Sequence, residues 1–291
     1  MDPKATAVVK KLTISDIQAK AARGEPLFQV TAVDYPTALL VDQAGIDFVL
    51  VGDSLGMVSL GYSSTVPVTM DEQIHHAKAI TRAAKHAIVV GDLPFGAYHA
   101  STADAINNAI RMQKEAGCDV VKMEGGKEFA PMIRAVVDAG VPVMGHMGLT
   151  PQLMTKLGGF KVQGKNVAAA LRLIEDALAL EEAGCFAMVL ESIPDRVAKE
   201  ITARVSIPTI SCGAGPWCKG QNMVLHDMIG FLERPMPRFS KKYVDVAAEI
   251  RKALDTFQEE VRASKFPGPE NCFTMKDEEY DALQAELRKR G

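Results

Sequence analysis

The sequence has few aromatic residues, and it lacks the long apolar segments that mark membrane-spanning and secreted proteins. Aromatic residues make up 6% of its 291 residues, and there is a single Trp. No segment reaches the ~18 uninterrupted apolar residues that a membrane-spanning helix needs. The opening stretch, Met-Asp-Pro-Lys-Ala-Thr, lacks the apolar core of a secretory signal. We therefore expect no membrane span and no secretory leader.

Cysteine is scarce, and positive charge is not in excess. The five Cys are odd in number, and no pair has the C-x-x-C spacing of many zinc and redox sites. This usage favours reduced thiols in the core of a cytoplasmic protein. The formal net charge of −3 argues against nucleic acid or an anionic membrane as a partner. The cysteines are Cys118, Cys185, Cys212, Cys218 and Cys272.

Short apolar stretches alternate with helical patterns along most of the chain. Strands without period-2 alternation are typical of a parallel sheet that is buried on both faces. Strands are predicted at 27–33, 48–51, 88–90, within 118–126, and at 141–144, 186–190, 207–211 and 223–231. Helices are predicted at 13–23, 36–44, 69–86, 102–116, 127–139, 167–183 and 194–204, with two more after residue 240.

Eight such units predict an α/β fold, a single (β/α)8 TIM barrel. An open doubly wound sheet is the alternative, because the last unit is weak. We expect one domain over 1–291. It comprises an N-terminal helix within 10–26, the barrel over 27–240 and C-terminal helices over 241–291.

Two charged residues interrupt the apolar strand within 118–126. Lys122 and Glu124 are two positions apart, so both side chains point to the same face of the strand. Burying charges without a use is costly. The pair therefore indicates a functional site, although a simple ion pair between the two would also explain it.

Charged or polar residues also end other predicted strands. In (β/α)8 barrels the active site lies at the carboxyl ends of the strands. Because these ends converge on one mouth, we expect the side chains to meet there. The residues at strand ends are Asp34, Asp53, Ser54, Asp92, Lys122, Glu124, His146 and Glu191.

Several carboxylates at one mouth repel each other unless a cation holds them. Mg²⁺ prefers oxygen ligands and typically takes one or two carboxylates, leaving other positions to water and substrate. We predict Asp53 and Asp92 as direct ligands, since each follows an apolar strand and a Gly. Glu124 is predicted as a third ligand, directly or through water. Each Asp alone would also suit a helix N-cap, and the six His show no zinc-like spacing.

A cation beside a Lys suits a 2-oxo acid, whose keto and carboxylate oxygens chelate a metal that stabilises an enolate. Lys122 and Ser54 are predicted to hold the substrate oxygens. Glu191, with apolar neighbours, is predicted as the base that moves the proton; a cap or an ion pair is the plain alternative. His146 either contacts substrate or is structural.

Seven segments in order along the chain carry a family resemblance. They are 31–36 (Thr-Ala-Val-Asp-Tyr-Pro), 51–56 (Val-Gly-Asp-Ser-Leu-Gly), 91–95 (Gly-Asp-Leu-Pro-Phe), 121–125 (Val-Lys-Met-Glu-Gly), 145–151 (Gly-His-Met-Gly-Leu-Thr-Pro), 158–165 (Gly-Gly-Phe-Lys-Val-Gln-Gly-Lys) and 213–216 (Gly-Ala-Gly-Pro). Together they resemble the ketopantoate hydroxymethyltransferase family from about residue 10 to 270.

The resemblance implies a barrel of the phosphoenolpyruvate/pyruvate superfamily. It implies transfer of a hydroxymethyl group from 5,10-methylenetetrahydrofolate to 3-methyl-2-oxobutanoate, giving 2-dehydropantoate for pantothenate and coenzyme A synthesis. On matching positions it makes Asp53, Asp92 and Glu124 contacts of Mg²⁺, and Asp53 and Asp92 also meet substrate. It makes Ser54 and Lys122 substrate contacts and Glu191 the proton acceptor. It also implies a homodecamer.

Three residues depart from the family pattern. Ser211 and Cys212 stand where Gly-Ile is usual, and Lys219 stands where Asp is common. We expect none of them to touch the predicted metal ligands. Lys219 could change a charge at the rim of the barrel. Folate binding and subunit contacts are therefore the properties that it would affect most.

Other interpretations fit parts of the pattern. A carbon–carbon lyase of the isocitrate lyase type would bind a metal through the same kind of carboxylates. The Lys-Lys-Cys-Gly-His run expected of such a lyase is absent from this sequence. A non-catalytic scaffold barrel is the other alternative. Such a protein would be more stable without the charges at the strand ends, so their presence argues against it. The Gly-rich segment 158–165 suits either a mobile lid or a plain surface loop.

Overall fold

The structure is a computed structural model that describes residues 10–233 and 235–291. The chain groups into two compact units, one ending at Tyr243 and one spanning Val244–Gly291. Each unit is described by itself, and the expectation of a single domain stays a prediction. Within the described residues, no helix combines the length and the apolar character that crossing a membrane requires.

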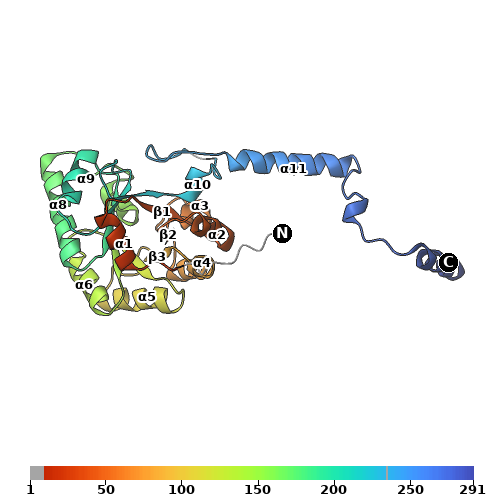
Figure 1. The fold of residues 1–291 in the computed structure, drawn as a ribbon, viewed down its shortest axis with the longest axis horizontal. Helices are drawn as coiled ribbons and strands as arrows, with labels where there is room; N and C mark the ends of the chain where they lie inside the picture. The colour runs from red at the N-terminus through yellow and green to blue at the C-terminus, as the bar shows by residue number, and fades with distance from the viewer. Residues whose placement is uncertain (1–9, 234) are drawn as a thin grey trace. The chain divides into compact units, whose positions relative to one another are not determined.

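Eight parallel strands close into a barrel in the first unit, and they pair in chain order from β1 to β8 and back to β1. This confirms the predicted (β/α)8 fold, and Figure 1 shows the strands within the helices of this unit. The strands are β1 (Leu27–Thr31), β2 (Phe48–Val51), β3 (Ile88–Asp92), β4 (Val120–Glu124), β5 (Val143–Gly148), β6 (Ala187–Glu191), β7 (Thr209–Cys212) and β8 (Gly220–Met223).

Helices follow the strands and cover the outside of the barrel. Many begin where the sequence supplies a cap: Thr69 and Glu72 form a capping box at the start of α4. The helices of this unit are α1 (Ile14–Ala22), α2 (Tyr35–Gln43), α3 (Leu55–Val58), α4 (Met70–Ala83), α5 (Thr102–Lys114), α6 (Ala130–Asp138), α7 (Met154–Leu157), α8 (Val167–Glu182), α9 (Asp195–Thr202) and α10 (Leu225–Met228), with a 3₁₀ turn η1 (Pro151–Leu153).

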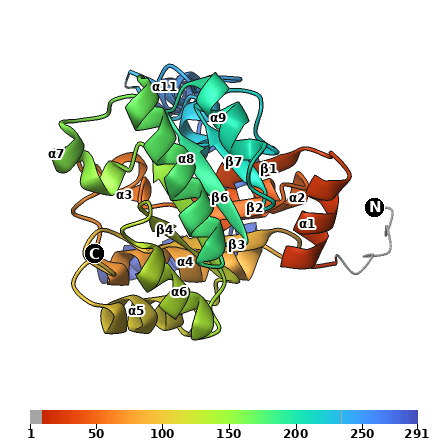
Figure 2. The same cartoon turned by 90° about the vertical axis from the view of Figure 1, so that its left-hand side faces the viewer.

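The apolar core has two parts. One lies between the strands and the surrounding helices. The other fills the inside of the barrel, where Phe48 and Ile88 pack with Ile17 of α1. In Figure 2, α1 lies on one side of the strands and the short helices α3 and α7 lie on the other. The barrel is therefore closed by apolar packing at its amino-terminal end, which leaves the opposite end for a site.

Gly91 shows why a glycine precedes a charged residue at a strand end. It lies in β3, where an added Cβ would be 2.4 Å from Met112 and 2.8 Å from the thiol of Cys118. The Gly therefore lets α5 pack closely on the outside of the barrel. Close helix packing is therefore the physical reason for this Gly.

The eighth strand differs from its prediction. The apolar run 223–231 is not a strand, because α10 (Leu225–Met228) occupies its middle. The strand is the preceding Gly-Gln-Asn-Met stretch, which has no apolar signature. Gly220 allows it, since a Cβ there would lie 2.8 Å from the backbone oxygen of Leu27 in the neighbouring strand.

The second unit contains helical segments, as predicted for the C-terminal region. These are α11 (Val246–Arg262), η2 (Pro269–Asn271) and α12 (Asp277–Arg290). Asp245 caps α11 by accepting a hydrogen bond from the backbone of Ala248. Leu254 and Phe257 on α11 are about half exposed within the chain, at 55% and 50%.

Candidate active site

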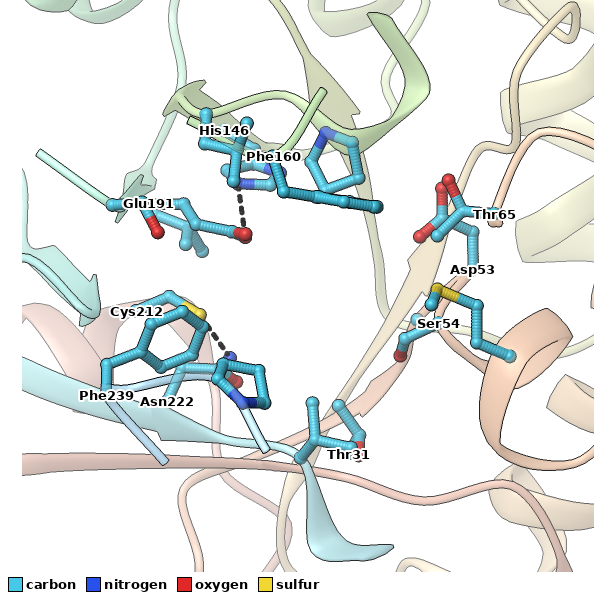
Figure 3. A pocket seen from close by; sticks show the side chains of 18 of the residues that line it. Thr31, Asp53, Ser54, Thr65, His146, Phe160, Glu191, Cys212, Asn222 and Phe239 are labelled. Carbon is cyan, nitrogen blue, oxygen red and sulfur yellow. Dashed lines mark hydrogen bonds and ion pairs between the residues drawn. The ribbon is translucent and has the colours of Figure 1, made fainter. Parts of the chain in front are cut away.

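A cavity of about 500 Å³ lies at the carboxyl ends of the strands. Its volume is within the usual range for small-molecule sites. Of the eight residues predicted at strand ends, the cavity brings together seven. They are Asp53, Ser54, Asp92, Lys122, Glu124, His146 and Glu191. Figure 3 shows Asp53 and Ser54 on one wall, with His146 and Glu191 across the cavity.

Asp53 and Asp92 are brought together by β2 and β3. Asp92 ends β3, and its Oδ2 accepts a hydrogen bond of 3.1 Å from the backbone N–H of Asp53. Both side chains are buried, with 4% and 1% of each residue exposed. Neither caps the following helix, because Ser101 caps α5 and α3 has no side-chain cap. The N-cap alternative does not explain these two carboxylates.

Lys122 provides the positive charge of the site. Its Nζ lies 2.9 Å from Oδ1 of Asp92 and 3.6 Å from Oε1 of Glu124, from the same face of β4. Burial lowers the pKa of Lys122, but Asp92 and Glu124 outweigh it and raise this pKa above its ordinary value. Lys122 is therefore an ammonium at neutral pH, held by two carboxylates and not by Glu124 alone.

His146 links the two remaining carboxylates. Its Nδ1 lies 3.0 Å from Oε1 of Glu124, and its Nε2 lies 3.2 Å from Oε2 of Glu191. Burial and Lys122 lower the pKa of His146, but Glu124 and Glu191 raise it more, to about 9. The imidazolium therefore lies between the two carboxyl groups and orients the side chain of Glu191.

Gln152 is a site residue that the sequence reasoning missed. Its Nε2 donates to Oδ2 of Asp53 at 3.0 Å, and its backbone N–H donates to Oε2 of Glu124 at 3.1 Å. Its side-chain oxygen lies 2.8 Å from the hydroxyl of Tyr98, which also accepts from the backbone N–H of Glu124. This buried pair, Gln152 and Tyr98, fixes the spacing between Asp53 and Glu124.

The three carboxylates compete for positive charge. Burial, Asp92 and Glu124 raise the pKa of Asp53 well above its usual value. Burial also raises the pKa of Asp92, and Lys122 offsets part of this effect. Burial would raise the pKa of Glu124, but His146 and Lys122 hold it below its usual range. A further cation beside Asp53 and Asp92 would therefore relieve the repulsion that remains.

The donor set suits a metal that needs few protein ligands. Among residues 10–233 and 235–291, no three or more His, Cys, Asp and Glu side chains are arranged to hold an ion by themselves. Mg²⁺ typically takes one or two carboxylates and completes its octahedron with water and substrate. The buried pair Asp53 and Asp92 has the oxygen chemistry for such an ion.

Two predicted features have other roles in the structure. Asp34, which follows the predicted strand 27–33 but lies beyond the end of β1, is exposed and does not line the cavity; it caps α2 by accepting from the backbone N–H of Thr37 at 2.9 Å. The turn in which Ser54 is predicted to hold substrate oxygens has one backbone N–H, that of Asp53, already bonded to Asp92.

Other cavity residues also escaped the sequence reasoning. Thr65, from the loop before α4, is 3% exposed, and its hydroxyl has no hydrogen-bond partner among the described residues. The apolar residues of the wall include Phe160, Val162, Met236 and Phe239. No local signal identifies the loop residues, whereas the buried Gln152 directly follows a segment, 145–151, that carries the resemblance.

The closed parallel barrel with a charged cavity at its carboxyl end defines the class of this protein: a (β/α)8 barrel built for a small-molecule ligand. The crystal structure of phosphonopyruvate hydrolase in complex with oxalate and Mg++ shares the fold. Its TM-score is 0.58 at 15% sequence identity, covering 95% of this chain and 96% of that chain. At this identity the similarity concerns the fold alone.

The family follows from the sequence comparisons. The family described as ketopantoate hydroxymethyltransferase matches residues 11–269. The 3-methyl-2-oxobutanoate hydroxymethyltransferase of Heliobacterium modesticaldum is 54% identical, covering 93% of this chain and 98% of that protein. The protein of the same name from Moorella thermoacetica is also 54% identical, covering 90% and 98%. The chain belongs to the ketopantoate hydroxymethyltransferase family, as the resemblance predicted.

Proposed function

We propose that this protein transfers a hydroxymethyl group from 5,10-methylenetetrahydrofolate to 3-methyl-2-oxobutanoate. The product is 2-dehydropantoate, which serves pantothenate and coenzyme A synthesis. Relatives that carry this activity in their names support the proposal, since they match nearly the whole chain. The observation that carries it is the buried set of Asp53, Asp92 and Lys122, which lines one cavity together with the partly exposed Glu191.

Asp53 and Asp92 would hold Mg²⁺, with Glu124 beside them. The ion would supply Lewis-acid stabilisation of negative charge on the keto oxygen of the substrate. The support within this chain is the buried, mutually repelling carboxylate pair. A protein of the same fold has been crystallised with oxalate and Mg++, and oxalate resembles the oxygen end of a 2-oxo acid.

Lys122 and Ser54 would orient the acid. The Lys122 ammonium sits in the cavity between Asp92 and Glu124, so it presents a fixed point charge to substrate oxygens. Ser54 lines the same cavity on the wall of Asp53. Together they would place C3 of the acid toward the opposite wall, where Glu191 lies.

Glu191 would take the proton from C3. The electron pair of that C–H bond would become part of an enolate, whose C3 would bond to the methylene carbon of the folate. The two bonds from this carbon to folate nitrogens would be replaced by one bond to C3 and one bond to the oxygen of a water molecule, so that tetrahydrofolate leaves with the protons that balance the step. Glu191 is 15% exposed at its side chain and so is reachable from the cavity. His146, with its Nε2 at 3.2 Å from Oε2, would orient this carboxyl group, which is what a general base requires. We assign His146 as a residue that positions the base beside the substrate.

The one-carbon donor needs room and an apolar surface. Phe160 and Val162 come from the Gly-rich loop, and Phe239 comes from the segment after α10. These residues form an apolar wall next to Glu191 that suits a flat ring such as a pterin. The cytoplasm as the compartment and a homodecamer as the assembly stay predictions.

The proposal is tested by incubating the protein with 3-methyl-2-oxobutanoate, 5,10-methylenetetrahydrofolate and Mg²⁺, and identifying the product by mass. We expect 2-dehydropantoate to form in proportion to enzyme and time. Omission of the folate is the matched control, because it removes the one-carbon unit but leaves the acid and the ion. No product with the full mixture would contradict the proposed function.

A further inference from the structure

Two polar residues lie together on the cavity wall beside Glu191. Cys212 ends β7, and Asn222 lies in the neighbouring strand β8. The amide Nδ2 of Asn222 donates to Sγ of Cys212 at 3.4 Å. Figure 3 shows this pair on the same side as Glu191 and Phe239, across the cavity from Asp53 and Ser54.

The state of the thiol fixes the orientation of the amide. Burial and the nearby Glu191 carboxylate raise the pKa of the Cys212 thiol well above its ordinary value, so the S–H is retained. With its hydrogen directed at Glu191, the sulfur is left as an acceptor. A sulfur acceptor must face the NH₂ side of an amide. This places Oδ1 of Asn222 away from the thiol.

That oxygen has no partner in the described part of the chain. Asn222 is 8% exposed, and its Oδ1 lacks a hydrogen bond although it is buried. Leaving a buried amide oxygen without a partner is unfavourable. Gln29, its register partner on β1, also has unpaired amide atoms, but Gln29 does not line the cavity and Asn222 does. The oxygen is therefore available to a molecule in the cavity.

We propose that Asn222, held by Cys212, is a recognition residue whose Oδ1 accepts a hydrogen bond from an N–H or O–H group of the bound ligand. The inference rests on the proposed function, because it takes the cavity as the substrate site. The isopropyl end of 3-methyl-2-oxobutanoate has no such donor. The donor therefore belongs either to the pterin ring of the folate or to a hydroxylated 2-oxo acid.

The test is a set of binding titrations in the presence of Mg²⁺. Wild type, Asn222→Val and Asn222→Leu are each titrated with tetrahydrofolate, 3-methyl-2-oxobutanoate and 4-hydroxy-2-oxobutanoate. Two apolar variants are used so that one remains if the other fails to fold. Gln221→Leu is the matched control, since Gln221 is the next residue of β8 and is exposed.

We expect the Kd of one donor-bearing ligand to rise roughly three- to tenfold in the Asn222 variants, the usual loss for one neutral hydrogen bond. A rise for tetrahydrofolate assigns the donor to the pterin, and a rise for the hydroxy acid assigns it to the acid. The Kd of 3-methyl-2-oxobutanoate should stay within about twofold, and Gln221→Leu should bind all three like wild type.

Unchanged Kd values for every ligand in a folded Asn222 variant would overturn the inference. Equal losses for all three ligands would also overturn it, because they would show a general distortion of the cavity. The product assay on wild type keeps the two proposals apart. Product formed by wild type together with unchanged binding in the variants rejects the recognition role alone. If wild type binds one donor-bearing ligand more tightly than the Asn222 variants do, but forms no product, the proposed reaction alone is rejected.

Discussion

The two ends of the barrel interior are built from the same strands, yet their chemistry is opposite. At the amino-terminal end, Phe48 and Ile88 are at most 1% exposed and pack against α1. At the carboxyl end, Asp92 is the last residue of the strand that Ile88 begins, and Lys122 and Glu124 lie on the neighbouring strand β4; all three are also buried. The first end stabilises the fold by removing apolar surface from water. The second end lowers stability, because it buries charges whose use lies in binding.

The difference shows how a parallel strand separates stability from function. Strands such as β3 and β4 are anchored by their apolar first halves, so the last residue of each is held in place whatever its chemistry. The cost of the buried charges is limited by pairing: Lys122 meets Asp92, His146 meets two Glu side chains, and Gln152 bridges Asp53 and Glu124. Substitutions at the two ends should therefore have opposite consequences.

The largest effect is expected for Glu191→Gln at the carboxyl end. Removing a general base typically costs about 10²- to 10⁴-fold in rate. We expect the exchange of the C3 hydrogen of 3-methyl-2-oxobutanoate with D₂O, followed by NMR, to fall by this amount, while the Kd of the acid stays close to wild type. Exchange at the wild-type rate would show that another group takes the proton.

The apolar end should respond in stability and not in chemistry. Ile88→Ala leaves a cavity inside the barrel, and such changes cost about 2–5 kcal/mol. We expect denaturant unfolding to show this loss, while the folded protein keeps the wild-type rate of C3 exchange per molecule. A variant as stable as wild type would mean that this end is not the tightly packed anchor described above.

The bridge between the carboxylates is tested by Tyr98→Phe. The change leaves Gln152 and the backbone of Glu124 without the phenol hydroxyl that holds them. Loss of a residue that orients metal ligands typically weakens metal binding 10- to 100-fold. We expect about a tenfold higher Mg²⁺ concentration for half-maximal exchange, with the same rate at saturating Mg²⁺. An unchanged Mg²⁺ dependence would argue that the pair only fills space.

The smallest effect is a gain in stability from Asp53→Asn. The pKa of Asp53 is raised in the folded protein, so this side chain favours unfolding once the pH exceeds its unfolded pKa of about 4. The Asn variant removes that penalty, so its advantage should grow as the pH rises from about 4. Denaturant unfolding in EDTA should show about 1 kcal/mol more stability at neutral pH, with exchange activity lost. A less stable variant would show that the carboxylate is well paired.

The sequence predicted the charged strand ends because each is a local pattern: an apolar run closed by a polar residue, as in β3 and β4. The same rule included Asp34, which caps a helix, because a helix cap and a metal ligand can have the same local sequence. Gln152 and Thr65 lie in loops, and only the closed barrel brings them to Asp53. The last strand was misplaced because its inward residue is Asn222, and a polar inward residue removes the apolar signal by which strands are recognised.

The central claim is that the carboxylates at the barrel mouth hold Mg²⁺ so that Glu191 can take a proton from a 2-oxo acid. Its most direct test is the rate of C3 hydrogen exchange of 3-methyl-2-oxobutanoate in D₂O, without folate, in metal-depleted protein and after Mg²⁺ is restored. We predict that exchange falls to the uncatalysed rate without metal and returns with Mg²⁺. Full exchange in metal-depleted protein would contradict the account.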